Sequence, residues 1–290
     1  MAAATYGLVL LAVFAKPLVS LMIYAAGSEV HSHIILIPFI VGYLLSIKRP
    51  FLPAAGRSSF GWAALFAAAG LTLWLTYFFV LGEARSENDQ FSIVSLSLIG
   101  FLVAGGFAFL GSRWMRAAAF PIAFLLFMVP LPDGVVAALE TASKYASAEA
   151  AALLFPVFGV PTYREGLIFS LPGIAIEVAQ ECSGIRSSWV LLITSLLAAH
   201  LFLRSNWRRT VLVALVIPLG ILRNGFRIAV IGWLCVHYGP EMIHSVIHKR
   251  GGPLFFTLAL IPLFGLLWLL RRGEANAPTG RIRQAPDERL

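Results

Sequence analysis

Apolar stretches separated by short polar segments set the pattern of the chain. They occupy residues 6–26, 34–47, 60–81, 91–110, 117–130, 185–203, 210–236 and 253–270. A helix needs roughly 20 predominantly apolar residues to cross the hydrocarbon core of a bilayer. The pattern therefore predicts an all-α polytopic membrane protein with about eight transmembrane helices. Because the second stretch is short, we expect its helix either to extend back through His33 or to be partly shielded by protein.

A different pattern separates the fifth and sixth stretches. Residues 135–155 mix charged residues with small apolar ones, which predicts an amphipathic helix at the membrane surface. In residues 163–178, two short apolar segments flank Pro172-Gly173, which predicts a β-hairpin. An isolated two-stranded ribbon is barely stable, so we expect it to pack on the amphipathic helix. Its free edge would suit pairing with an extended peptide.

Composition supports the membrane class and gives it an orientation. Hydrophobic residues make up 59% of the chain and charged residues 12%, against roughly 25% charged in soluble domains. The net charge of +8 comes from basic clusters between apolar stretches, which is typical of the positive-inside pattern and excludes a nucleic-acid-binding domain. The predicted cytoplasmic cations are Lys48, Arg49, Arg57, Arg113, Arg116, Arg204, Arg208, Arg209, Arg271 and Arg272. We expect one integral-membrane domain over residues 1–272, a disordered cytoplasmic tail over 273–290, and the amphipathic helix and hairpin outside.

The segment Q-E-C-S-G-I-R-S-S places Cys182 where polar sequence meets the sixth apolar stretch. A helix beginning near Ser183 would direct its free N–H groups and positive dipole end at the sulfur, and Arg186 would add a positive charge. Both effects favour the thiolate, which is the nucleophilic form of cysteine. Arg186 has an alternative role as an anchor for Glu181. The segment indicates a membrane-embedded cysteine enzyme.

Two arginines lie inside the seventh stretch. A charge within hydrocarbon costs at least ~2.5–3.5 kcal/mol, so each needs a reason to be there. Arg227 lies roughly 25 Å of helical rise past the start of the stretch, near the predicted outer boundary. Arg223 lies one turn below it, beside Asn224. Burial next to a functional site is one explanation, and snorkelling to the outer headgroups is the other.

The loop after the seventh stretch supplies histidines on the same predicted membrane face. His244 and His248 would share one helical face if residues 241–250 were helical. Histidine titrates near neutral pH and can move protons between a thiol and a leaving amine. Cys182, Arg227 and a histidine would therefore meet at the extracytoplasmic edge of the bilayer.

Two alternatives come from other functional classes. Glu241, His244 and His248 could form a zinc-dependent peptidase site, although H-S-V-I-H lacks the glutamate of H-E-x-x-H. An anion-binding transporter or scaffold would instead use Arg223 and Arg227.

Several short motifs, in order along the chain, carry a family resemblance. They are S-H-I-I-L-I-P at 32–38, R-E-G with L-P-G at 164–173, C-S-G-I at 182–185, N-G-F-R at 224–227 and H-K-R-G-G at 248–252. In these motifs the chain resembles the exosortase/archaeosortase transpeptidases. The departures are two successive glycines after the histidine and the basic Lys249-Arg250 pair.

The resemblance implies a chemistry for each residue. Cys182 would be the nucleophile, Arg227 the oxyanion stabiliser and His248 the acid/base, with His244 as a second candidate. The supporting residues would be Glu181, Ser183, Arg186, Arg223 and Asn224. Substrates would be exported proteins with a C-terminal sorting signal of the PEP-CTERM kind, which combines a proline-containing motif, a membrane helix and a basic end. The acceptor would be a lipid, a glycan or water, with no metal or cofactor, in the cytoplasmic (inner) membrane of a bacterium or archaeon.

Overall fold

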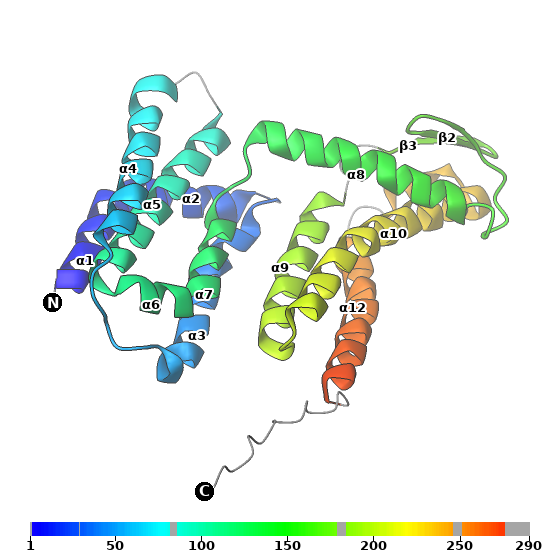
Figure 1. The fold of residues 1–290 in the computed structure, drawn as a ribbon. Coiled ribbons are helices and arrows are strands. Elements are labelled where there is room, and N and C mark those ends of the chain that lie inside the picture. The colour runs from blue at the N-terminus through cyan, green and yellow to red at the C-terminus, as the bar shows by residue number, and fades with distance from the viewer. Residues whose placement is uncertain (1, 29, 82–85, 179–183, 246–250, 276–290) are drawn as a thin grey trace, which may run out of the picture. The chain divides into compact units, whose positions relative to one another are not determined.

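A computed structural model describes residues 2–28, 30–81, 86–178, 184–245 and 251–275. The chain divides into two compact units, Met1–Glu140 and Thr141–Leu290, each described by itself (Figure 1). Within the described residues, 6 helices are long and apolar enough to span a membrane, and up to 8 if each of two bent pairs forms one span. The predicted multi-pass helical class is confirmed.

The first apolar stretch forms two helices instead of one. α1 (Ala2–Val13) and α2 (Ala15–Gly27) meet at Phe14 with a bend of 63°. Pro17 has no N–H to donate to the carbonyl of Val13, which loosens the helix at this point. The Phe14 ring is 3% exposed and packs against Trp74, 5.3 Å away between ring centroids. The bend between α1 and α2 is therefore favoured both by Pro17 in the sequence and by the contact of Phe14 with Trp74.

The second span extends back as expected. The 3₁₀ helix η1 (Ser32–Leu36), α3 (Ile37–Lys48) and η2 (Arg49–Phe51) together form a candidate span over Ser32–Phe51. His33 and Ile34 are both buried, which draws this part of the chain into the first unit.

The next two spans pack with their backbones in contact. α4 (Phe60–Thr76) continues as the π-helix η3 (Tyr77–Leu81), and both pack on α5 (Glu87–Phe109). A Cβ added to Gly70 would lie 3.1 Å from the carbonyl oxygen of Ser97, and that serine's hydroxyl donates to the Gly70 carbonyl at 2.8 Å. Small residues at such crossings allow close approach, as is common between membrane helices.

Opposite charges gather at different ends of the first unit. The Lys48 ammonium donates to the Ala117 carbonyl at 2.9 Å, which joins α3 to the end of α6 (Gly111–Ala117). α7 (Ala119–Phe124) and η5 (Leu125–Met128) lead away from this basic end. The Asn88 amide donates to Asp133 Oδ1 at 2.7 Å at the acidic end. This separation within the unit agrees with the predicted distribution of charge.

The segment between the fifth and sixth apolar stretches contains a third strand. α8 (Asp133–Leu154) leads to β1 (Tyr163–Glu165), β2 (Ile168–Leu171) and β3 (Ile174–Glu177), an antiparallel sheet in the order β1-β2-β3. The predicted hairpin is thus present, with Gly173 at φ +82° in its turn. Phe169 is fully buried, 5.1 Å from the Phe155 ring that follows α8. The sheet therefore packs against the end of α8, as expected.

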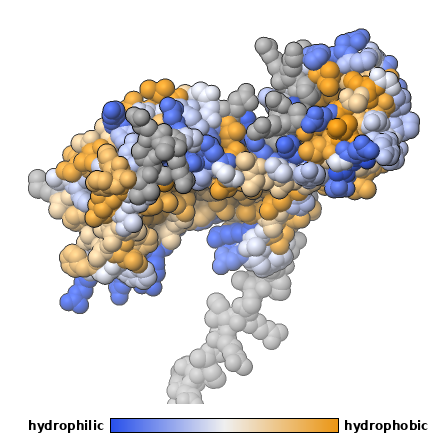
Figure 2. All heavy atoms as spheres, turned by 90° about the horizontal axis from the view of Figure 1, so that it is seen from above, coloured by the Kyte–Doolittle hydropathy of each residue, from blue (hydrophilic) through white to orange (hydrophobic). Residues whose placement is uncertain are grey.

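Three long helices complete the second unit. α9 (Ile185–Phe202), α10 (Asn206–Tyr238) and α12 (Gly252–Ala275) pack around Leu191, Leu212 and Leu263, each at most 2% exposed. α12 continues to Ala275, and the remainder of the predicted tail lies outside the described residues. Apolar residues cover much of the surface in the view of Figure 2, as expected of helices that face lipid.

Candidate functional site

The described residues hold part of the predicted catalytic set. Arg227 lies on α10, whereas Cys182, His248, Glu181 and Ser183 lie outside the described residues. The surroundings of the nucleophile are therefore built from the segments on either side of it in the chain.

The helix after Cys182 begins slightly later than predicted. α9 starts at Ile185, preceded by Gly184 at φ +68°, a left-handed conformation that favours glycine. The Gly184 carbonyl accepts from the Ser188 amide at 3.0 Å and closes the first turn. The free N–H groups of that turn lie at the N-terminal end of the helix, where they favour an anion. Arg186 lies in this turn and is exposed.

Arg223 connects α10 to the start of α9. Its side chain is buried, and its Nη2 donates to the Gly184 carbonyl at 3.1 Å, between residues 39 positions apart. Its Nη1 is also buried and has no hydrogen-bond partner among the described residues. Arg223 is thus turned into the protein, and snorkelling does not explain it.

Asn224 connects the same site to α8. Its side chain is 2% exposed, and its Nδ2 donates to the Ser147 hydroxyl at 3.0 Å. A Cβ on Gly184 would lie 2.8 Å from both Arg223 Nη2 and Asn224 Cγ. Gly184 therefore packs tightly on these two side chains.

Small residues bring α8 onto α10 at this level. A Cβ on Gly225 would lie 2.5 Å from Ala150 Cβ and 3.0 Å from the Ala151 backbone nitrogen. Sequence reasoning missed Gly225 and Ser147 as positioning residues. The available signals were a glycine inside the seventh stretch and the small residues at 147–151.

Arg227 follows Arg223 by one helical turn and is half-buried. Residues four apart on a helix lie on one side, about 6 Å apart along the axis. Two guanidinium groups therefore make this side of α10 strongly cationic. Such a side can stabilise a thiolate or an oxyanion.

The shared helical face of His244 and His248 was conditional on a helix over residues 241–250, and the described part of this segment is not one continuous helix. α10 ends at Tyr238, Gly239 adopts φ +110°, and the 3₁₀ helix η7 covers only Pro240–His244. Ser245 is extended, at φ −63° and ψ 161°, so the helix does not continue through it, and His248 lies outside the described residues. The described part of this segment therefore gives no support to the helical face that the zinc alternative assumed. No cluster of three potential metal ligands occurs among the described residues.

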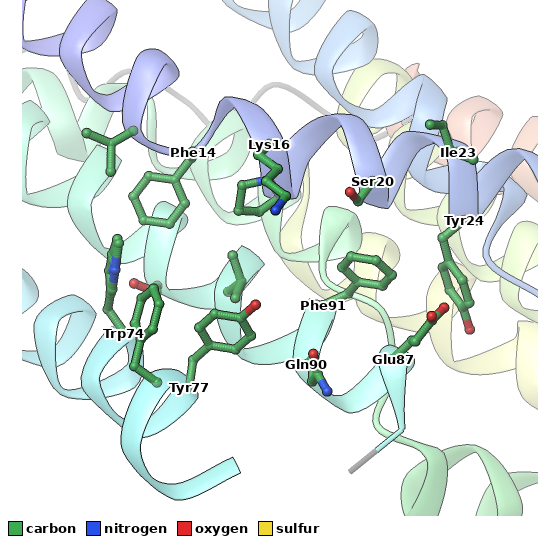
Figure 3. A pocket seen from close by; sticks show the side chains of 15 residues that line it. Phe14, Lys16, Ser20, Ile23, Tyr24, Trp74, Tyr77, Glu87, Gln90 and Phe91 are labelled. Carbon is green, nitrogen blue, oxygen red and sulfur yellow. The ribbon is translucent and has the colours of Figure 1, made fainter. Parts of the chain in front are cut away.

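The first unit contains a cavity of about 640 Å³. Figure 3 shows α2 on one side of it and the ends of α4 and α5 on the other. Its walls are mainly aromatic and apolar, with Lys16 and Glu87 as the charged lining residues. Lys16 therefore borders a cavity, and the described member of the predicted catalytic set, Arg227, does not line it.

These features define a multi-pass, mostly helical membrane protein in which a small antiparallel sheet packs beside the arginine-bearing helix. A family model described as transmembrane exosortase (Exosortase_EpsH) matches residues 4–265. Because this match covers most of the chain, the protein belongs to the transmembrane exosortase family, as its short motifs suggested. Exosortases are generally regarded as transpeptidases. No curated protein and no solved structure matches the chain.

Proposed function

We propose that this exosortase is a cysteine transpeptidase that cleaves the C-terminal sorting signal of exported PEP-CTERM-type proteins. The Cys182 thiolate attacks a backbone carbonyl of the signal, and the C-terminal fragment leaves as an amine. The resulting thioester is then attacked by an acceptor, which releases the thiol. Residues 1–272 act as one membrane domain, with the site on the extracytoplasmic side of the cytoplasmic membrane.

Each charged residue has a distinct role in this proposal. Arg227 donates to the oxyanion of the tetrahedral intermediate, where a charged hydrogen bond is strongest. His248 protonates the leaving amine and then deprotonates the acceptor, with His244 as the alternative. Arg186 favours the thiolate by its charge. This chemistry requires neither a metal nor an organic cofactor.

The observation that carries the proposal is the hydrogen bond from Arg223 to the Gly184 carbonyl. Only one residue separates Gly184 from Cys182, so the two Cα atoms are at most about 7 Å apart. Arg227 is one turn further along α10 than Arg223. The bond therefore supports a short distance between the sulfur and the catalytic arginine, which are far apart in sequence.

Co-expression with an exported reporter that carries a C-terminal signal tests the proposal. Cys182→Ala should abolish processing, and Arg227→Gln should reduce it by roughly 10²-fold or more, as the loss of an oxyanion donor does elsewhere. Cys235→Ala is the matched control because that thiol is 3% exposed within the core beside the sheet. Processing that persists in Cys182→Ala would refute the assigned nucleophile.

Trapping the intermediate identifies the reaction more directly. Hydroxylamine attacks a thioester and should release the reporter as a hydroxamate, which adds a defined mass to its new C-terminus. Without hydroxylamine, the mass of the mature reporter distinguishes a lipid or glycan acceptor from water. Full activity of Cys182→Ala with loss of activity in Arg227→Gln would instead favour an anion-binding role.

A further inference from the structure

The small sheet has two outer strands with different surroundings. β2 occupies the middle, so β1 and β3 form the edges. On β1 the Arg164 side chain binds Glu149 of α8, with Nη1 and Oε1 3.0 Å apart. β3 is the edge nearer to the nucleophile along the chain, since Glu177 precedes Cys182 by five positions.

The register shows which backbone groups of β3 face away from β2. Residues Leu171 and Ile174 face each other across the turn, and the Val178 amide donates to the Leu167 carbonyl at 3.0 Å. Bonded and non-bonded pairs alternate along an antiparallel ladder. Ala175 and Glu177 therefore occupy the non-bonded positions, and their N–H and C=O groups point outward from the sheet.

These outward groups have no backbone hydrogen bond to any other part of the described chain. Ala175 and Glu177 are also exposed, whereas Ile176 between them is buried against the core beside α10. The edge is short, with exposed residues on one face and apolar, more buried residues on the other. It can add a strand without any rearrangement of β2.

We propose that the β3 edge binds the extended segment of the sorting signal that precedes the cleaved bond, as a parallel fourth strand. This inference rests on the proposed function, because it assigns the substrate-binding surface of that same site. A parallel strand carries its C-terminal end past Glu177, toward the nucleophile. An antiparallel strand would carry the same end back toward Pro172 and away from Cys182.

Parallel pairing is compatible with a signal that contains proline. Only alternate residues of an edge-bound peptide exchange hydrogen bonds with the neighbouring strand, and the intervening N–H groups face solvent. A proline at an intervening position loses no bond to β3. The two residues of β3 whose backbone groups point outward, Ala175 and Glu177, can pair with a peptide segment of about four residues, because only alternate residues form hydrogen bonds.

A single backbone substitution tests the edge. Ala175→Pro removes an outward N–H and no bond to β2, whereas Ala175→Val adds bulk but keeps that N–H. We expect kcat/KM for reporter cleavage to fall roughly three- to tenfold in Ala175→Pro relative to Ala175→Val, the effect of one lost hydrogen bond. The rate at which a small alkylating reagent modifies Cys182 should be equal in the two variants. Equal cleavage by both would overturn the edge proposal.

A second measurement uses unaltered enzyme, so it does not depend on how Ala175→Pro folds. Synthetic signal peptides carry one N-methyl group each, moved stepwise along the segment before the cleaved bond. Losses of cleavage that alternate with a period of two residues support strand pairing, and uniform losses or none contradict it. Activity in Cys182→Ala would refute the nucleophile instead, so failure of the proposed function and failure of the edge proposal give different results.

Discussion

A methyl group added at Gly184 tests the arrangement on which the proposed site depends. Alanine at φ +68° would be held in the left-handed region, which costs roughly 1–2 kcal/mol. Its Cβ would also lie 2.8 Å from Arg223 Nη2 and from Asn224 Cγ. The asparagine cannot yield easily because it is 2% exposed and bound to Ser147.

The contact adds to the backbone strain. Displacing Arg223 from the Gly184 carbonyl removes a hydrogen bond to a charged group, worth about 1.5–3 kcal/mol. We therefore expect Gly184→Ala to lower the free energy of unfolding by about 3–5 kcal/mol. Reporter processing should fall roughly tenfold or more, because the segment next to the nucleophile moves relative to Arg227.

Gly173→Ala is the matched control. Gly173 also has a positive φ, of +82°, but a Cβ there would meet nothing within 4 Å. Chemical unfolding in detergent micelles should show a loss of only about 1–2 kcal/mol, with processing retained. If Gly184→Ala and Gly173→Ala were equally stable and equally active, the close packing of Gly184 on α10 would be refuted.

Three further predictions concern other parts of the molecule. Gly225→Ala should lower the free energy of unfolding by about 1–3 kcal/mol, because α8 must move away from α10. Gly265→Ala places its Cβ with nothing within 4 Å, so the same unfolding assay should show a neutral or stabilising effect. Lys16→Met should leave the melting temperature unchanged or raise it, since the Lys16 ammonium has no hydrogen bond or ion pair among the described residues. Lys48→Met should lower the melting temperature, because it loses the hydrogen bond of 2.9 Å to the Ala117 carbonyl. Burial lowers the pKa of His31 despite the opposing charge of Asp133, so the unfolded chain binds the proton more readily, and stability should fall as the pH drops below about 6.5. His31→Gln should weaken that pH dependence, and an unchanged profile would contradict it.

Much of the fold follows from local sequence. Long apolar runs form helices because a backbone in hydrocarbon must satisfy its hydrogen bonds internally. The Pro172-Gly173 turn follows from the fixed φ of proline and the freedom of glycine at positive φ. β1 was not predicted because its three residues, Tyr163–Glu165, show no apolar alternation and are strands only through their pairing with β2.

Other local patterns did not reveal where a helix bends or ends. Residues 6–26 look like one continuous helix, but the contact of Phe14 with Trp74 stabilises a bend that the pattern does not reveal. The spacing of His244 and His248 would place them on one face only of a continuous helix, but the chain becomes extended at Ser245. The spacing of residues in the sequence indicates a shared helical face only where those residues form one continuous helix.

By itself, the sequence determined the multi-pass helical class, the family motifs and the residues able to perform cysteine chemistry. Tertiary structure decided that Arg223 points inward to Gly184 and that Asn224 meets Ser147, across 39 and 77 positions of the chain. Such pairings depend on the rotation and crossing of whole helices, which small residues such as Gly225 permit. No pattern within a single helix contains that information, because each contact is a property of two surfaces together.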